Sequence, residues 1–150
     1  MLTHIQHVAI LTSNIDEAMD HYVELLGCER PAVIDVDKVG VKLRTVMLPI
    51  GTDGRTFLQI IEPRQGPGVE ELARGGEGTL FEVGFEVDDI EALHDCLAEK
   101  DIKPRDLAGN PISGKYIESR YGNRYFILPK DKTRGTRTEV VQVRIGPDRS

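Results

Sequence analysis

Four polar side chains interrupt segments of the chain that are otherwise apolar. His7 lies in an apolar run near the N-terminus, and Gln59 lies within Phe-Leu-Gln-Ile-Ile. Glu82 lies between Phe81 and Val83, and Glu139 lies between Thr138 and Val140. Burying a polar group without a partner is costly, so each needs a hydrogen bond or a cavity to face. Any one of them could instead lie on a solvent-exposed face. Imidazole, amide and carboxylate groups brought together would form a polar site able to hold an ion and move protons.

The spacing of these four residues indicates such a shared site. His7 and Glu82 are separated by half of the 150-residue chain (82 − 7 = 75), and Gln59 and Glu139 by slightly more (139 − 59 = 80). The pattern His-Val-Ala-Ile-Leu-Thr-Ser-Asn-Ile-Asp at 7–16 returns as Glu-Val-Gly-Phe-Glu-Val-Asp-Asp-Ile-Glu at 82–91. An internal repeat of this kind predicts two equivalent structural units. A cavity on their pseudo-twofold axis would receive equivalent positions from both.

Each half is expected to contain a strand, a helix and three further strands, on the basis of apolar periodicity and capping residues. Asn14 and Gly27 should bound the first helix, whose apolar positions include Leu25 and Leu26, and Asp88 should cap the second helix with Glu91 as its capping-box partner. The expected elements are strands at 4–12, 32–39, 41–48 and 57–61 with a helix at 14–26, then strands at 80–87, 112–119, 124–128 and 138–143 with a helix from 89 to about 100.

Glycines and prolines punctuate residues 63–78, which are expected to link the halves around a short amphipathic piece at 69–74. The fold class predicted is α+β, a single domain over 1–150 built of two βαβββ modules at about 4–62 and 79–144, whose sheets curve into a cup. His21 and His94 should face solvent from the two helices. Cys28 and Cys96 are expected to be small packing residues.

Composition narrows the function classes. The chain carries 19 Lys and Arg against 25 Asp and Glu, a net charge of −6, which argues against a nucleic-acid-binding surface. The sequence contains no run of 18 apolar residues, so no membrane span is predicted. The N-terminal residues lack the basic and apolar regions of a secretion signal, and two cysteines are too few for a disulfide framework, so a cytoplasmic protein is expected.

The chain resembles the vicinal oxygen chelate superfamily, which includes glyoxalase I, methylmalonyl-CoA epimerases, extradiol dioxygenases and bleomycin-resistance proteins. The epimerases and their relatives are the most similar group. The resemblance covers nearly the whole chain and rests on HVAI and NIDEAMDHYVELLG (within 7–27), VMLPIG (46–51), FLQIIEP (57–63), GGEGTLFEVGFEVDDIEAL (75–93) and YFILPKDKTRGTRTEVVQ (125–142).

The resemblance implies one divalent metal in the cup, with ligands at His7, Gln59, Glu82 and Glu139. The epimerases have a histidine where this chain has Glu82. Two carboxylates neutralise a divalent ion and make it a weaker Lewis acid, and an oxygen-rich ligand set suits Mn²⁺, Co²⁺, Ni²⁺, Mg²⁺ or Zn²⁺. It also departs from the two-histidine, one-carboxylate set of the extradiol dioxygenases. A homodimer is common in the superfamily.

The activity implied is proton transfer next to a carbonyl in a small 2-oxo or thioester substrate with adjacent oxygens, by a metal-dependent isomerase or lyase of the methylmalonyl-CoA epimerase or lactoylglutathione lyase kind. The metal would stabilise the enolate or enediolate, with Glu139 as the first candidate base and Glu82 as the second. The epimerases have a further glutamate on the second strand. This chain has no glutamate there; Asp37 could take its place or could belong to a turn.

Two alternatives belong to other classes. A metal-free binding protein of the bleomycin-resistance type would use an aromatic cleft, and this chain has no Trp, four Tyr and four Phe. Thiol transfer of the fosfomycin-resistance type would need two histidines and a glutamate, which Glu82 contradicts. The polar turn at 120–124 could bind a carboxylate or phosphate through its arginines, or be simply solvated.

Overall fold

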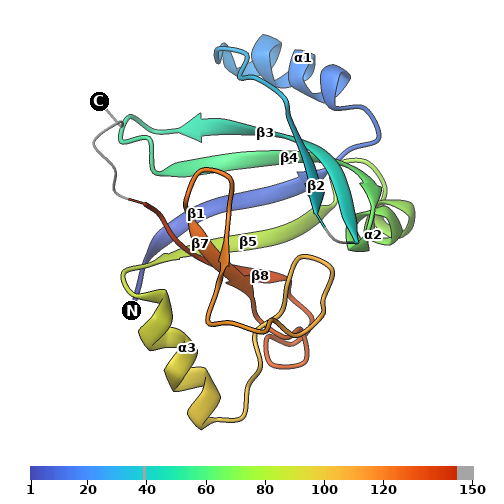
Figure 1. Ribbon diagram of the computed structural model, residues 1–150. Coiled ribbons are helices and arrows are strands. Elements are labelled where there is room, and N and C mark those ends of the chain that lie inside the picture. Colours follow the sequence, from blue (N-terminus) through green and yellow to red (C-terminus); the bar gives the residue numbers. More distant parts are fainter. Residues whose placement is uncertain (39, 145–150) are drawn as a thin grey trace. The chain divides into compact units, whose positions relative to one another are not determined.

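The computed structural model describes residues 1–38 and 40–144, which form eight strands and three helices (Figure 1). Each unit described below contains parallel and antiparallel strand pairs. The chain divides into two compact units, one of His7–Glu82 and the other of Met1–Gln6 with the described residues from Val83 onward. The elements are β1 (Leu2–Leu11), α1 (Ile15–Leu26), β2 (Ile34–Lys38), β3 (Val41–Ile50), β4 (Thr56–Gln65), α2 (Pro67–Gly75), β5 (Leu80–Val87), α3 (Ile90–Glu99), β6 (Ile117–Glu118), β7 (Arg124–Ile127) and β8 (Thr138–Gln142).

In the unit of His7–Glu82 the strands are ordered β2-β3-β4-β1-β5. Alternate residues of its strands point to opposite faces, as strand geometry requires. One face packs against α1 through a core of Ile15, Met19, Val46, Leu48 and Ile60. The other face carries the cluster of Ala9, Leu11 and Ile61. His7 and Gln59 share the parity of this second cluster, so both point away from α1.

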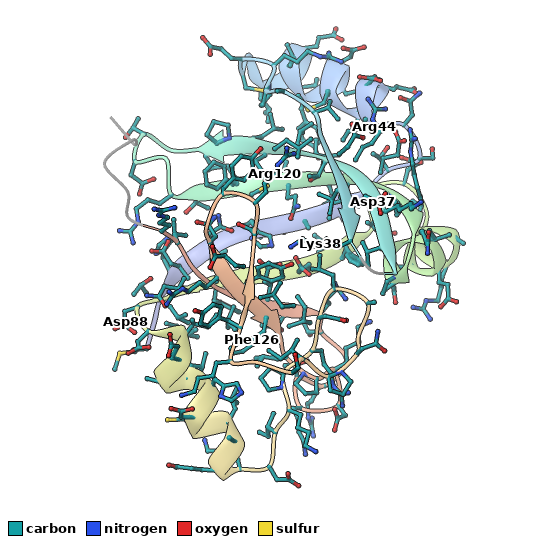
Figure 2. All side chains as sticks on the ribbon, in the orientation of Figure 1. Asp37, Lys38, Arg44, Asp88, Arg120 and Phe126 are labelled. Atoms are coloured by element: carbon teal, nitrogen blue, oxygen red, sulfur yellow. The ribbon has the colours of Figure 1, made fainter. Side chains whose placement is uncertain are left out.

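In the other unit the strands are ordered β1-β5-β8-β7-β6. The core beneath α3 consists of Val87, Ile90, Phe126 and Val140, with Phe85 packed against it. Phe126 lies on β7, as Figure 2 shows. Because Val140 and Phe85 point toward α3, their neighbours Glu139 and Gly84 point to the opposite face.

The two units repeat one another in register as well as in element order. β1 pairs in parallel with β4, so that Ala9 lies opposite Gln59, and β5 pairs in parallel with β8, so that Gly84 lies opposite Glu139. The two pairs differ by the offsets of the sequence repeat (84 − 9 = 75; 139 − 59 = 80). The predicted α+β class and the repeat are therefore confirmed. That the repeats fold as a single domain stays a prediction.

Helix capping repeats with the same offsets. The Ile15 amide donates to Glu62 Oε2 at 3.0 Å, and the Ile90 amide donates to Gln142 Oε1 at 3.1 Å. Each acceptor lies three residues after the Gln59 or Glu139 of its own unit. A helix leaves its first amides without intrahelical partners, so both units use a strand side chain to satisfy one of them.

The first helix has the predicted caps, but the cap of the second is one residue later than predicted. Asn14 accepts from the Glu17 amide, and Gly27 ends α1 in the left-handed conformation. Asp89, not Asp88, caps α3 by accepting from the Ala92 amide. The Asp88 carboxylate instead binds the N-terminal ammonium of Met1, and Figure 2 shows Asp88 at the start of α3.

Two segments differ from the sequence-based expectation. The predicted strand at 112–119 is reduced to Ile117–Glu118, and residues 63–78 hold the end of β4 and the helix α2 in addition to loops. Gly66 and Gly76 bound α2, and Pro67 opens it. The end of the strand predicted at 32–39 lies outside the described residues.

Several side chains are more exposed or more buried than expected. Leu25 and Leu26 are 78% and 68% exposed and so do not contribute to the apolar stripe of α1. Cys96 is exposed and Cys28 half-buried, so the packing role is wrong for Cys96. His21 is exposed as predicted, whereas His94 is half-buried. Among residues 1–38 and 40–144, no helix has the length and apolarity to cross a membrane.

Candidate metal site

His7 and Glu82 form a buried pair within one unit. The His7 Nε2 lies 3.0 Å from the Glu82 Oε1, and the two residues are only 2% and 7% exposed. They lie on neighbouring strands, since the Leu11 amide bonds the Thr79 carbonyl and the Gly78 amide bonds the Leu11 carbonyl farther along. The repeat-equivalent residues of the sequence therefore meet each other directly.

This pair consists of groups that can bind a metal ion. A buried carboxylate is costly unless it is paired, and here the Glu82 carboxyl group is paired with the His7 imidazole. The lone pair of a deprotonated Nε2 and the carboxylate oxygens are ordinary ligands of divalent ions.

Gln59 lies in the same unit, half-buried on β4 and on the same face as His7. Its Nε2 donates to Thr45 Oγ1 at 3.0 Å, and Thr45 Oγ1 donates to the Ile60 carbonyl at 3.0 Å. This chain of bonds fixes the Gln59 amide and assigns its nitrogen to Thr45. The Oε1 atom is then the one that can serve as a ligand, because a metal binds the amide oxygen.

Thr45 was not identified from the sequence, although it supports Gln59. It is buried on β3, where its register partner on β4 is Ile61. Residues that orient ligands in this way tune metal affinity. A threonine in a β-strand has high strand propensity and so gives no signal of this role by itself.

Glu139 lies in the other unit, half-buried in β8 between Gly84 on one side and Ile127 on the other. It is the structural equivalent of Gln59, and the residue opposite each of them is small, Ala9 or Gly84. Convergence of Glu139 with His7 and Glu82, which belong to the other unit, stays a prediction. Imidazole and carboxylate donors together would suit the divalent ion that the sequence predicts.

Asp37, the possible second-strand base, has a different setting. It is exposed on β2, where Figure 2 shows it, and its carboxylate lies 3.9 Å from the Lys42 ammonium on β3. An exposed ion pair between paired strands is an ordinary surface feature. A role for Asp37 as a base stays a prediction.

The two arginines of the polar turn at 120–124 contact other side chains of the protein. The Arg124 guanidinium lies 3.2 Å from Glu91 and 4.5 Å from the ring centre of Tyr116. Arg120 lies over the ring of Tyr121 at 5.6 Å, and Figure 2 shows it on the loop before β7. Binding of an anion by this turn stays a prediction.

Comparisons with known proteins agree with this fold. Solved structures of methylmalonyl-CoA epimerases are similar over nearly their whole length. One, in complex with methylmalonyl-CoA and NH4+, is 22% identical with a TM-score of 0.70 and covers 97% of each chain. The Streptomyces coelicolor enzyme with 2-nitronate-propionyl-CoA is 23% identical over 97% of each chain, with a TM-score of 0.70. The Mycobacterium tuberculosis epimerase is 16% identical, with a TM-score of 0.74, over 95% of this chain and 89% of its own.

At these identities the likeness to solved structures concerns the fold alone. No curated protein matches the sequence. Residues 6–112, more than half of the chain, match the Glyoxalase/Bleomycin resistance protein/Dioxygenase superfamily. The chain therefore belongs to the Glyoxalase/Bleomycin resistance protein/Dioxygenase superfamily, as the resemblance in its sequence predicts.

Proposed function

We propose that this protein is a metal-dependent isomerase or lyase that moves a proton next to a carbonyl group. The observation that carries the proposal is the buried pair of His7 and Glu82, at equivalent positions of the two repeats. The superfamily and the epimerase neighbours support an isomerase. Methylmalonyl-CoA epimerase and lactoylglutathione lyase are the two activities closest to this chemistry.

His7, Gln59, Glu82 and Glu139 would hold the metal ion, which is Mn²⁺, Co²⁺, Ni²⁺, Mg²⁺ or Zn²⁺. Such an ion supplies Lewis acidity, polarising the substrate carbonyl and stabilising the negative charge that develops on its oxygen. Support for Gln59 comes from its fixed amide, and support for Glu139 from its repeat equivalence to Gln59. Support for His7 and Glu82 comes from their burial together.

The proton would be moved by the carboxylates. Glu139 accepts the proton from the carbon next to the carbonyl, leaving the electron pair delocalised onto the carbonyl oxygen. If Glu82 returns a proton to the opposite side of that carbon, the result is epimerisation. If Glu139 returns the proton to the former carbonyl carbon, and the hydroxyl proton of the first carbon passes to the former carbonyl oxygen, the result is the hemithioacetal-to-thioester conversion of a lyase.

The substrate would be a small molecule with adjacent oxygens, either a 2-oxo compound or a thioester. Two of the epimerase structures hold CoA thioesters, which favours the thioester. A homodimer and a cytoplasmic location are further expectations from the resemblance.

The test combines metal content with proton exchange. Protein purified without chelators should contain about one divalent ion, and Mn²⁺ added after chelation should raise the melting temperature, because a ligand that binds only the folded state stabilises it. In D2O the Mn²⁺ protein should exchange the Cα proton of methylmalonyl-CoA, followed by NMR. The hemithioacetal of methylglyoxal and glutathione is the second substrate.

The Glu139→Gln variant should lose the exchange while remaining folded, and the exposed Glu99→Gln variant is the matched control. If the wild-type protein shows no metal binding and no metal-dependent stabilisation, the metal proposal is contradicted. Exchange that survives in Glu139→Gln would exclude Glu139 as the base.

A further inference from the structure

Tyr121 is an exposed aromatic residue in the turn between β6 and β7. The chain has four Tyr and four Phe, all among the described residues, and of these eight side chains only Tyr121 is exposed, at 61%. An exposed aromatic ring offers a flat face on which another planar group can stack. The other aromatic side chains are buried or half-buried, so Tyr121 provides the stacking surface of this protein.

Hydrogen bonds fix the turn that carries Tyr121. The Gly122 amide donates to the Ser119 carbonyl at 2.9 Å, and the Ser119 amide donates to the Asn123 carbonyl at 2.7 Å. The Asn123 amide also donates to the Ser119 Oγ at 3.1 Å. Arg120 and Tyr121 are the two central residues of this turn, so their side chains are carried by an ordered backbone. A ligand bound to an ordered surface costs less conformational entropy than one bound to a mobile loop.

Two arginines lie against this turn. The Arg120 guanidinium lies over the Tyr121 ring, 5.6 Å from its centre, and Figure 2 shows Arg120 on the loop before β7. Arg144, which follows β8, is tied to the turn because its amide donates to the Asn123 Oδ1 at 3.0 Å. Gly122 has a φ of +80°, and a β-carbon there would lie 2.9 Å from the Arg144 Cδ. The glycine therefore lets the Arg144 side chain lie directly against the turn.

The charges of Arg120 and Arg144 make this turn a local positive site on a chain of net charge −6. Arg124, at the end of the turn, pairs with Glu91 at 3.2 Å and lies opposite Glu118 on β6. Arg120 and Arg144 are both exposed, and among the described residues neither forms an ion pair. Guanidinium groups bind phosphate oxygens through paired hydrogen bonds. The turn thus combines a stacking surface with groups that bind phosphate.

We propose that Tyr121, Arg120 and Arg144 bind the phosphorylated purine nucleoside of a thioester substrate. The base would stack on the face of the Tyr121 ring opposite the Arg120 guanidinium, and the phosphate groups would bind the two guanidinium groups. The proposal names the substrate class of the proposed function and rests on that function for its role. The binding of a nucleotide by itself does not depend on it.

The spacing between the turn and Glu139 agrees with a substrate whose nucleotide is separated from the reacting carbonyl by a linker. Arg124, at the end of the turn, pairs with Gln142 on β8, and Glu139, the proposed base, lies three residues earlier on the same strand. Three residues of a strand span about 10 Å. A thioester that carries a nucleotide at the far end of its chain can extend over such a distance. The hemithioacetal of methylglyoxal and glutathione has no nucleotide to place there.

Nucleotide binding is tested in the chelated protein, without metal or substrate, by calorimetric titration with adenosine, pyrophosphate and ADP. ADP should bind more tightly than adenosine or pyrophosphate, because it uses the ring and the arginines together. Tyr121→Ala should weaken ADP binding about tenfold or more, the factor typical of a lost base–aromatic stack, and leave pyrophosphate binding unchanged. Tyr121→Phe keeps the ring and should keep ADP binding. Arg144→Gln should weaken the binding of both ADP and pyrophosphate.

Arg134→Gln is the matched control, because Arg134 is exposed on the loop before β8. Its ADP affinity should equal that of the wild-type protein. All of these side chains are exposed, so each variant should keep the wild-type melting temperature. Absence of ADP binding at millimolar concentration would overturn the nucleotide site, and so would equal ADP affinities of Tyr121→Ala and the wild-type protein.

The role in substrate binding is tested by the kinetics of the Mn²⁺ protein. Tyr121→Ala should raise the KM for methylmalonyl-CoA about tenfold with little change in kcat, because a contact remote from the reacting carbon contributes equally to the ground state and the transition state. The KM for the hemithioacetal should not change. An unchanged KM for methylmalonyl-CoA in a variant that has lost ADP binding would overturn the role in substrate binding. If the Mn²⁺ protein acts on neither substrate, the proposed function fails, and the titration with ADP still decides whether the nucleotide site exists.

Discussion

The His7 Nε2 lies 3.0 Å from the Glu82 Oε1, so two residues 75 positions apart in the sequence form one buried pair. The same offset relates the two halves of the chain, and the pair therefore joins equivalent positions of the repeat. The two modules differ chemically at this position, because one has an imidazole where the other has a carboxylate. This inequality is the basis of the predictions about the site.

Replacement of Glu82 should affect stability according to whether an acceptor is kept. In the chelated protein Glu82→Ala removes the carboxyl group that lies 3.0 Å from the His7 Nε2, and we expect it to lower the free energy of unfolding by about 1–3 kcal/mol. Glu82→Gln keeps an oxygen at the same reach and should cost less. Urea unfolding measures both variants. Equal losses would mean that the hydrogen bond contributes nothing.

Replacement of Thr45 should act on metal binding through Gln59. Thr45→Val removes the acceptor of the Gln59 Nε2 while keeping nearly the same shape, so the amide is no longer fixed with its oxygen available. Loss of such an orienting contact typically weakens metal affinity about 10–100-fold. Mn²⁺ titration measures the effect, and the exposed Thr52→Val variant is the control. Unchanged Mn²⁺ affinity would exclude Gln59 as an oriented ligand.

The sequence predicts the repeat well because its signals are local. The run of β-branched and apolar residues followed by an Asx cap occurs at both 7–16 and 82–91, and the offset then assigns Glu139 to the position of Gln59. Parallel pairing of β1 with β4 and of β5 with β8 confirms this assignment. The convergence of all four polar residues on one ion stays a prediction.

Features that depend on contacts distant in the sequence are less predictable. Asp88 and Asp89 are equally good caps by type; Asp89, the repeat equivalent of Asn14 (14 + 75 = 89), caps α3, whereas Asp88 binds the Met1 ammonium. The helix α2 is short and rich in glycine, so its composition is typical of a loop. Thr45 gives no recognisable signal, because its role follows from its partner Gln59 on the neighbouring strand.

The two strand residues that cap helices should contribute to stability and not to the site. Glu62→Ala and Gln142→Ala each remove the acceptor of a first-turn amide, at Ile15 or Ile90. A lost cap typically costs about 1 kcal/mol. For a chain of this size that corresponds to a melting temperature lower by about 2–4 °C. Differential scanning calorimetry should show the decrease, with unchanged Mn²⁺ affinity and with the exposed Glu24→Ala variant as control.

Glu77 should make the stability of the fold depend on pH in the acid range. Its carboxylate accepts hydrogen bonds from the Ser13 amide and the Thr12 hydroxyl, both at 2.7 Å, and so ties the loop before β5 to the end of β1. The bonds from Ser13 and Thr12 hold the pKa of Glu77 below its ordinary value. A carboxyl group with a lowered pKa in the folded state stabilises the fold above its unfolded pKa, which is about 4.3 for glutamate.

That contribution should be fully present at neutral pH and lost as the pH falls below about 4.3 and through the lower pKa of the folded state. Because the carboxylate is exposed to solvent, it is expected to contribute about 1 kcal/mol at most. The Glu77→Gln variant should be less stable than the wild-type protein at pH 7 and approach it in stability toward pH 3, as followed by urea unfolding. Glu70→Gln, an exposed residue of α2, is the matched control. The stabilisation by an ionised Glu77 is lost when the carboxylate is protonated. A difference in the free energy of unfolding between the wild-type protein and Glu77→Gln that is the same at pH 7 and pH 3 would therefore show that the charge of Glu77 does not hold the loop.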